Sequence, residues 1–118
     1  MTALDLALDW TPNTNHTGFY VAQSEGYYTD RGLDVAIHSP ADDDYETTPA
    51  KQVATGEATV AIAPSESAIS YQTHPDYDSL TAIAAVCHED KSAIVTLEDS
   101  GVDRPADLDG HRYASYDA

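Results

Sequence analysis

The sequence has little positive charge. Its 118 residues contain only 5 lysines and arginines against 21 aspartates and glutamates, which gives a formal net charge of −16 at pH 7. A surface this acidic repels nucleic-acid phosphates and anionic membranes, so we expect no nucleic-acid partner. Because the acids are spread along the whole chain, we interpret them as a halophile-type adaptation in which abundant cations screen the self-repulsion. An acidic patch for a basic partner is the alternative.

Cysteine and long apolar runs are also scarce. The single cysteine, Cys87, excludes an intrachain disulfide. Because it ends an apolar run, we expect its side chain to be buried. No run approaches the about 20 apolar residues of a membrane span, and no signal peptide precedes the first predicted strand. We therefore expect an extracytoplasmic protein if a leader has been removed, and a cytoplasmic one otherwise.

The short motifs of several enzyme classes are missing. The five histidines form no close ligand pair of the HExxH kind, so we predict no metal site. The sequence contains neither a glycine-rich phosphate loop nor a GxSxG nucleophile elbow. The residues themselves therefore predict no catalytic group and no cofactor.

What the sequence does contain is enough apolar residues, 42% of the total, to form a folded domain. Alternating apolar segments predict strands at 3–8, 33–37, 59–63, 80–87 and 92–97, with a sixth opening at 113. Helical patterns lie at 16–25, 47–55 and 64–72, with one further turn at 104–108. Strands and helices alternate through the first 75 residues, which predicts a parallel α/β sheet flanked by helices.

Ligands bind beyond the carboxyl ends of the strands in such sheets, and the loop after the first predicted strand carries suitable groups. Trp10 offers a flat stacking face, and Asn13, Asn15 and His16 offer hydrogen-bond donors and acceptors. The alternative interpretation is a half-buried tryptophan followed by an asparagine that caps the next helix. Both interpretations stay open on position alone.

Two further candidates follow later strands. Glu66 lies where the third predicted strand meets its helix and could pair with a ligand amino group, although ordinary helix capping is the slightly favoured interpretation. His88 follows the fourth predicted strand and is either a pocket-edge residue or part of a solvated turn. The aromatic residues Phe19, Tyr27 and Tyr28 are interpreted as packing residues rather than a stacking platform.

Residues 8–22, which read LDWTPNTNHTGFYVA, resemble the opening motif of the thiamine-pyrimidine family. That family joins fungal-type pyrimidine synthases to bacterial solute-binding proteins for thiamine precursors. Segments 25–35, 56–61 and 101–113 are similar to later segments of the same family, in order. The resemblance implies a type II periplasmic-binding-protein-like fold of two α/β lobes around a ligand cleft. Residues 1–97 would form the first lobe, and 98–118 the crossover and start of a second lobe whose remainder is absent.

The resemblance also implies a function. It indicates a substrate-binding protein for a thiamine pyrimidine precursor, of the formylaminopyrimidine or hydroxymethylpyrimidine type, with transporter membrane subunits as further partners. The synthases of the family carry a lysine that holds pyridoxal phosphate and a histidine four residues later. Ala63 and Ser67 stand at those positions, and neither side chain can form a Schiff base. A cytoplasmic pyrimidine-forming enzyme and a ligand-sensing domain on the same fold are the alternatives.

Overall fold

The computed structural model describes residues 1–77, 80–87, 89 and 93–114. The chain divides into two compact units, 1–84 and 85–118. Within the described residues, the three strands and three α-helices belong to the first unit. The expected division after residue 97 concerns the two lobes of a longer protein and stays a prediction.

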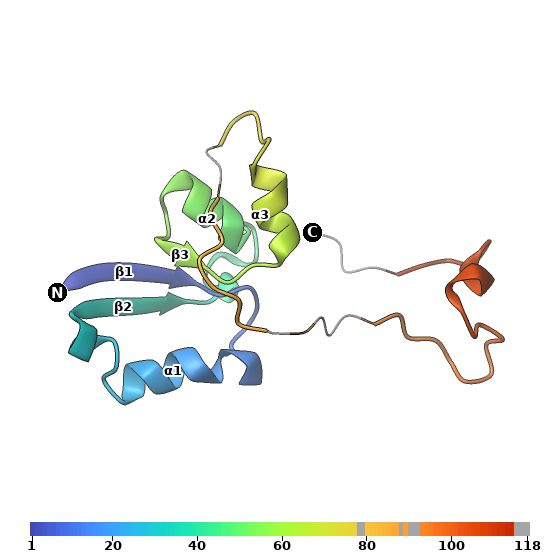
Figure 1. Ribbon diagram of the computed structural model, residues 1–118, viewed down its shortest axis with the longest axis horizontal. Coiled ribbons are helices and arrows are strands. Elements are labelled where there is room, and N and C mark those ends of the chain that lie inside the picture. Colours follow the sequence, from blue (N-terminus) through green and yellow to red (C-terminus); the bar gives the residue numbers. More distant parts are fainter. Residues whose placement is uncertain (78–79, 88, 90–92, 115–118) are drawn as a thin grey trace. The chain divides into compact units, whose positions relative to one another are not determined.

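Three parallel strands form the sheet of the first unit (Figure 1). They are β1 (Thr2–Ala7), β2 (Leu33–His38) and β3 (Val60–Ala61), in the order β2-β1-β3. The central strand β1 pairs along its whole length with β2, and its last residue, Ala7, lies opposite both His38 and Ala61. The predicted α/β architecture with a parallel sheet flanked by helices is confirmed.

The helices begin and end where capping residues allow it. They are α1 (Thr17–Ser24), α2 (Pro49–Thr55) and α3 (Ser65–Tyr71), with 3₁₀ turns η1 (Thr14–His16), η2 (Thr29–Arg31) and η3 (Pro40–Asp43). Helix α2 is the clearest case, since the Thr48 side chain accepts a hydrogen bond from the backbone N–H of Lys51. Gly56 ends α2 with a φ of 82°, a left-handed conformation that glycine adopts without steric cost.

The strand order reverses direction at β1. The chain steps from β1 to β2 on one side, and then crosses back to β3 on the other side. Because crossover connections are right-handed, these opposite steps place α1 and α2 on opposite faces of the sheet. Figure 1 shows α1 on one face and α2 and α3 on the other. The carboxyl ends of β1 and β3 therefore meet at a switch point, where open α/β sheets bind ligands.

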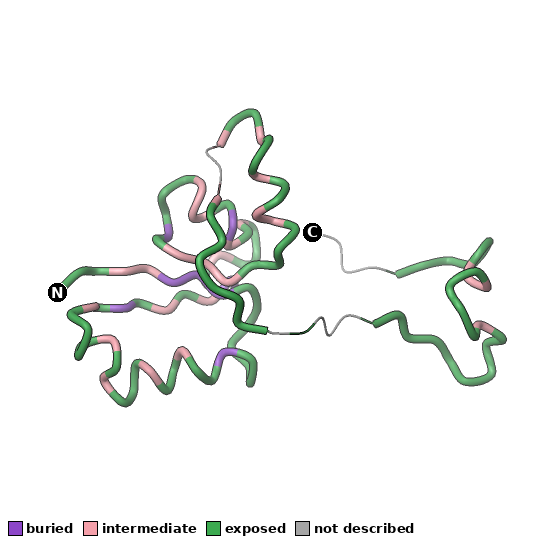
Figure 2. Tube along the Cα trace, viewed as in Figure 1, coloured by how far each residue is buried: buried purple, intermediate pink, exposed green. Residues whose placement is uncertain are grey.

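The core lies between the sheet and α1. Leu6, Leu8 and Val35 are buried, and Leu6 lies opposite Ile37 in the register, so their side chains share one face of the sheet. Partly buried residues complete this cluster: Leu4, Phe19, Tyr28, Leu33, Ile37, Val60 and Ile62. Figure 2 shows how few residues are fully buried along the chain. The packing predicted for Phe19 and Tyr28 is confirmed, whereas Tyr27 is 57% exposed.

The strands predicted at 80–87 and 92–97 are wrong for the residues that the structure describes. Residues 80–87 and 93–97 form no strand, and Ile83 and Val95 are 79% and 88% exposed. An extended segment becomes a strand only when a neighbour pairs with its backbone N–H and C=O groups, and alternation alone does not supply that neighbour. For the same reason Cys87 is exposed rather than buried. The strand predicted to open at Tyr113 is likewise absent from residues 113 and 114.

The predicted turn near 104–108 is present in the second unit as η4 (Pro105–Leu108). Asp107 holds it, because its carboxylate accepts hydrogen bonds from the backbone N–H groups of Asp103 and Arg104 and from Arg104 Nε. The Arg104 guanidinium, with these backbone donors, lowers the pKa of the Asp107 carboxyl below its ordinary value. No helix in the described part of the chain is long and apolar enough to cross a membrane.

The acidic side chains face solvent. None of the aspartates and glutamates that the structure describes is buried, and only Asp5, Asp43 and Asp107 are partly covered. Among the described residues, Arg104 with Asp107 is the one ion pair that involves a lysine or arginine. Most of the negative charge is therefore balanced by counter-ions from the solvent. Under this condition we expect added salt to have its largest effect on stability.

We expect the melting temperature to rise when KCl is raised from about 0.1 M to about 1 M, because the Debye length then falls from about 10 Å to about 3 Å. A gain of ~1 kcal/mol corresponds to a rise of roughly 4–8 °C for a domain of this size. Differential scanning calorimetry measures it. Sucrose is the control for general stabilisation, because it stabilises proteins through its exclusion from their surface and does not screen charge. A melting temperature that stays constant or falls in KCl contradicts the halophile-type interpretation.

Candidate ligand-binding site

An aromatic pair lies at the carboxyl edge of the sheet. Trp10 follows β1, Tyr45 lies between η3 and α2, and their ring centroids are 5.2 Å apart at an interplanar angle of 49°. The spacing and tilt are those that aromatic pairs prefer. Both residues remain exposed, at 45% and 47% of their surface. The Thr11 hydroxyl and the Tyr45 phenol share a hydrogen bond that ties the two loops together.

The loop that carries Tyr45 has an unusual backbone. Asp44 and Tyr45 have φ values of 55° and 63°, a left-handed conformation that is rare outside glycine. The backbone N–H of Tyr45 donates to Pro40 O at 2.8 Å, and that of Thr47 donates to the Asp43 carboxylate at 3.0 Å. These hydrogen bonds hold the backbone of the left-handed pair in place.

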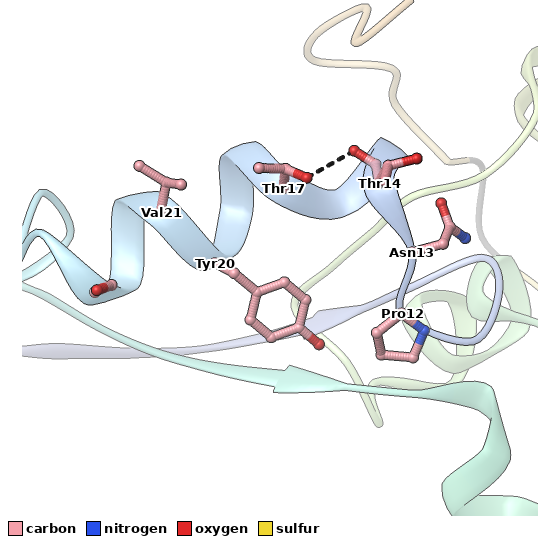
Figure 3. Close-up of a pocket in the computed structure, with 7 residues that line it drawn as sticks. Pro12, Asn13, Thr14, Thr17, Tyr20 and Val21 are labelled. Carbon is pink, nitrogen blue, oxygen red and sulfur yellow. Dashed lines mark hydrogen bonds between the residues drawn. The ribbon is translucent and has the colours of Figure 1, made fainter.

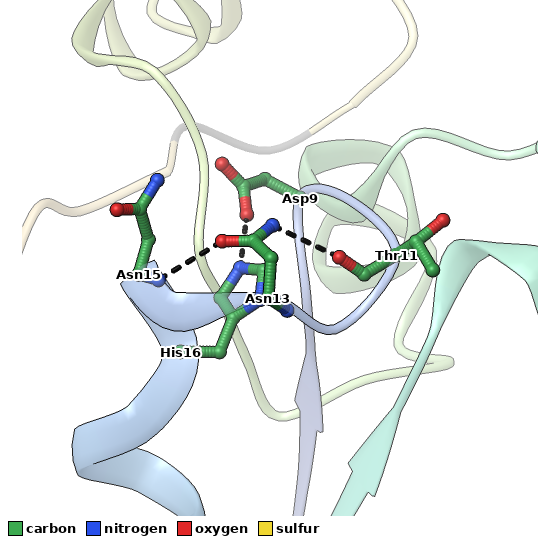
Figure 4. Close-up of polar contacts among 5 residues, drawn as sticks. All are labelled: Asp9, Thr11, Asn13, Asn15 and His16. Atoms are coloured by element: carbon green, nitrogen blue, oxygen red, sulfur yellow. Dashed lines mark hydrogen bonds and ion pairs between the residues drawn. The ribbon is translucent and has the colours of Figure 1, made fainter.

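The loop after Trp10 is closed by a capping box (Figure 4). The Asn13 Oδ1 atom accepts from the backbone N–H of Asn15 at 2.9 Å, and its Nδ2 atom donates to Thr11 O at 2.9 Å. In return, the backbone N–H of Asn13 donates to His16 Nδ1 at 3.2 Å. The pattern is the reciprocal one that satisfies the free donors of a helix start.

His16 completes this network inside the protein. Its ring is 2% exposed, and its Nε2 atom lies 2.7 Å from Asp9 Oδ1. Because Nδ1 accepts a backbone hydrogen bond, the proton of the neutral imidazole is on Nε2, which donates to the Asp9 carboxylate. The ring therefore joins the end of β1 to the start of η1 and is shielded from any ligand in solvent.

The structure thus separates the predicted site residues into two groups. Asn13 and His16 are used within the loop, which agrees with the capping interpretation of this segment. The Trp10 ring, by contrast, is nearly half exposed. The Asn15 side chain points away from the loop (Figure 4), and no hydrogen bond to its amide is present in the described part of the chain. Trp10 and Asn15 therefore face solvent, whereas Asn13 and His16 shape the loop that carries them.

The remaining two candidates are less well defined. Glu66 is exposed in the first turn of α3, at the carboxyl end of β3, and its Oε2 atom accepts a hydrogen bond from the Ser65 hydroxyl at 3.2 Å. An acid in this position also interacts favourably with the helix dipole. His88 lies outside the residues that the structure describes. The roles of Glu66 and His88 at a pocket rim stay predictions.

A second surface feature lies along α1 and the turn that precedes it (Figure 3). It is a shallow depression of about 580 Å³ lined by Pro12, Asn13, Thr14, Thr17, Tyr20, Val21 and Ser24. Its lining contains no carboxylate and no cation, and it contains neither Trp10 nor Tyr45. Binding sites for polar small molecules converge charged or polar groups on an enclosed ligand, so the carboxyl edge of the sheet is the better candidate.

Reasoning from the sequence missed two residues of this edge. Asp9 lies in the same loop as Trp10. The sequence does not indicate that its carboxylate bonds to His16 while its side chain remains 43% exposed. Tyr45 lies 35 positions from Trp10 in a stretch that reads as an acidic loop. No local pattern points from one to the other. The strand order β2-β1-β3 is what brings the two loops together.

Comparisons with known proteins agree with this architecture. The model of the NMT1/THI5-like family matches residues 13–118. This chain belongs to the NMT1/THI5-like family. The resemblance to the thiamine-pyrimidine family drawn from segments 8–22, 25–35, 56–61 and 101–113 is therefore confirmed.

Two relatives of this NMT1/THI5-like chain have informative names. The formylaminopyrimidine-binding protein of Halalkalibacterium halodurans is 30% identical over 110 residues, which cover 93% of this chain and 32% of that protein. A putative thiamine biosynthesis protein of Haemophilus influenzae is 28% identical over 109 residues, which cover 92% of this chain and 33% of that protein. The chain thus spans about a third of the length of each of these relatives.

The two asparagines of the NMT1/THI5-like loop make a matched test of the capping box. We expect Asn13→Ala to lower the free energy of unfolding by about 1 kcal/mol, because it removes a cap that accepts a backbone N–H. Asn15→Ala should change it by less than about 0.5 kcal/mol, as exposed side chains outside such features usually do. Urea denaturation followed by circular dichroism measures both. Equal losses for the two variants would show that the Asn13 side chain does not hold the loop.

Proposed function

We propose that this protein binds a thiamine pyrimidine precursor, of the formylaminopyrimidine or hydroxymethylpyrimidine type, and feeds uptake or thiamine biosynthesis. The observation that carries the proposal is the exposed Trp10–Tyr45 pair at the switch point of the sheet, in a chain of the NMT1/THI5-like family. The name of the Halalkalibacterium relative, a formylaminopyrimidine-binding protein, supports the ligand class.

The groups at this edge match the chemistry of an aminopyrimidine. The ligand is a flat aromatic ring with an exocyclic amino donor beside a ring-nitrogen acceptor. Trp10 supplies a stacking face, and the partly exposed Asp9 carboxylate supplies an acceptor for the amino group. The Asn15 amide offers both a donor and an acceptor. In the proposed complex Asn13 and His16 act indirectly, by holding the loop on which Asp9 and Trp10 lie.

The other parts of the proposal concern the longer protein. Glu66 and His88 would contribute at the rim, and a second lobe would close over the ligand by a hinge motion. In the uptake version of the proposal, transporter membrane subunits are the next partners and receive the ligand. The side chains of Ala63 and Ser67, which have no amine, support a binding role without a Schiff-base cofactor.

Calorimetric titration of the full-length protein in about 1 M KCl, where surface charges are screened, tests this function. The ligands are formylaminopyrimidine, hydroxymethylpyrimidine, thiamine and pyridoxal phosphate. We expect a pyrimidine precursor to bind, and Trp10→Ala to weaken it by about tenfold or more, because stacking of a base on an aromatic ring contributes ~1–3 kcal/mol. Tyr27→Ala is the matched control, since Tyr27 is an exposed aromatic residue on the connection into the amino end of β2.

Two results would contradict the proposal. Pyridoxal phosphate that binds with the absorbance of a Schiff base would indicate the enzyme alternative. Absence of heat with both pyrimidines, from a protein that unfolds cooperatively in the same buffer, would leave the family assignment intact and exclude this ligand class. Equal weakening by Trp10→Ala and Tyr27→Ala would show that the ligand does not stack at the carboxyl edge.

A further inference from the structure

Tyr45 is the residue at the carboxyl edge whose conformation is hardest to explain by folding alone. Both Asp44 and Tyr45 adopt the left-handed conformation, and a bulky aromatic residue there is a genuine outlier. Strain of this kind persists only where surrounding contacts hold it, and such positions gather at ligand sites. The strained backbone here places a tyrosine ring beside the only tryptophan in the sequence.

Two contacts join the Tyr45 side chain to Trp10 and its loop, and a third anchors the loop that carries Tyr45. The rings meet at 5.2 Å between centroids. The Tyr45 hydroxyl shares a hydrogen bond with Thr11, the residue next to Trp10. The Tyr45 backbone N–H donates to Pro40 O at 2.8 Å, which anchors the loop to η3. The Trp10 side chain is thereby held from a second loop, although its own loop leaves it 45% exposed.

The geometry points to Tyr45 as the positioning residue of the proposed pyrimidine site. It restrains the Trp10 ring in one orientation before the ligand arrives, so that less side-chain entropy is lost on binding. This inference rests on the proposed function for its ligand, but the restraint on Trp10 can be measured without any ligand.

The first experiment uses the ligand-free, full-length protein. Near-ultraviolet circular dichroism and acrylamide quenching of fluorescence report on Trp10, and spectra of the same variants with Trp10→Phe added isolate its contribution. We expect Tyr45→Ala to weaken the Trp10 dichroic band and to increase the quenching of Trp10 fluorescence. Tyr45→Phe should preserve the band because it keeps the ring, and Tyr27→Ala should leave it unchanged. Far-ultraviolet dichroism checks folding, and Tyr45→Leu replaces Tyr45→Ala if the latter does not fold.

The second experiment titrates the same variants with formylaminopyrimidine and hydroxymethylpyrimidine. Tyr45→Ala should raise the Kd by about tenfold, which is the size of an aromatic pair contact, and Tyr45→Phe by less than about threefold. An unchanged Trp10 spectrum in Tyr45→Ala overturns the inference. A changed spectrum with unchanged affinity overturns it as well, because the restraint would then not serve binding. If the parent protein binds neither pyrimidine, the proposed function fails, and the Trp10 spectrum alone decides whether Tyr45 positions the ring.

Discussion

The parallel pairing of β1 on both of its edges is the constraint on which the rest of the structure depends. β1 is the only strand with two neighbours in the described sheet, and Leu6 within it and Leu8 directly after it are two of the three buried members of the core cluster. Because β2 and β3 both run parallel to β1, one on each side of it, the loops that follow the three strands lie at the same edge of the sheet. The positions of Trp10, Tyr45 and Glu66 are consequences of that order rather than of their own sequence neighbourhoods.

The loop after β1 shows how one segment serves both folding and binding. Its polar residues are of the type that recognises a heterocycle, but Asn13 and His16 are bonded within the loop. Burying a histidine ring without hydrogen-bond partners costs free energy. His16 is only 2% exposed, and both of its ring nitrogens have a partner. What the loop presents to solvent is the Trp10 ring, the Asn15 amide and part of the Asp9 carboxylate. In the proposed site, rigidity comes from the residues that are bonded within the loop, and recognition comes from those that face solvent.

The sequence predicted the elements whose signal is local. The alternation at 3–8 and 33–37 and the helical pattern at 47–55 are such local signals, and the structure has strands at Thr2–Ala7 and Leu33–His38 and a helix at Pro49–Thr55. Predictions failed where a distant partner decides the outcome. Residues 80–87 alternate as a strand does, but no strand pairs with the described residues. The sequence also indicated Trp10 as one candidate stacking residue, with a half-buried tryptophan as the alternative. It did not indicate Tyr45, because the contact between the two depends on strand order and on a left-handed backbone that Asp44 and Tyr45 do not ordinarily favour.

The central claim is that the carboxyl edge of β1 and β3 is the ligand site of this NMT1/THI5-like chain. A crystal structure of the full-length protein with formylaminopyrimidine tests it most directly. The account predicts the pyrimidine ring stacked on Trp10, with its amino group directed toward the Asp9 carboxylate. A ligand seated in the depression along α1, beside Tyr20 and Val21, or in any position away from Trp10, would contradict it.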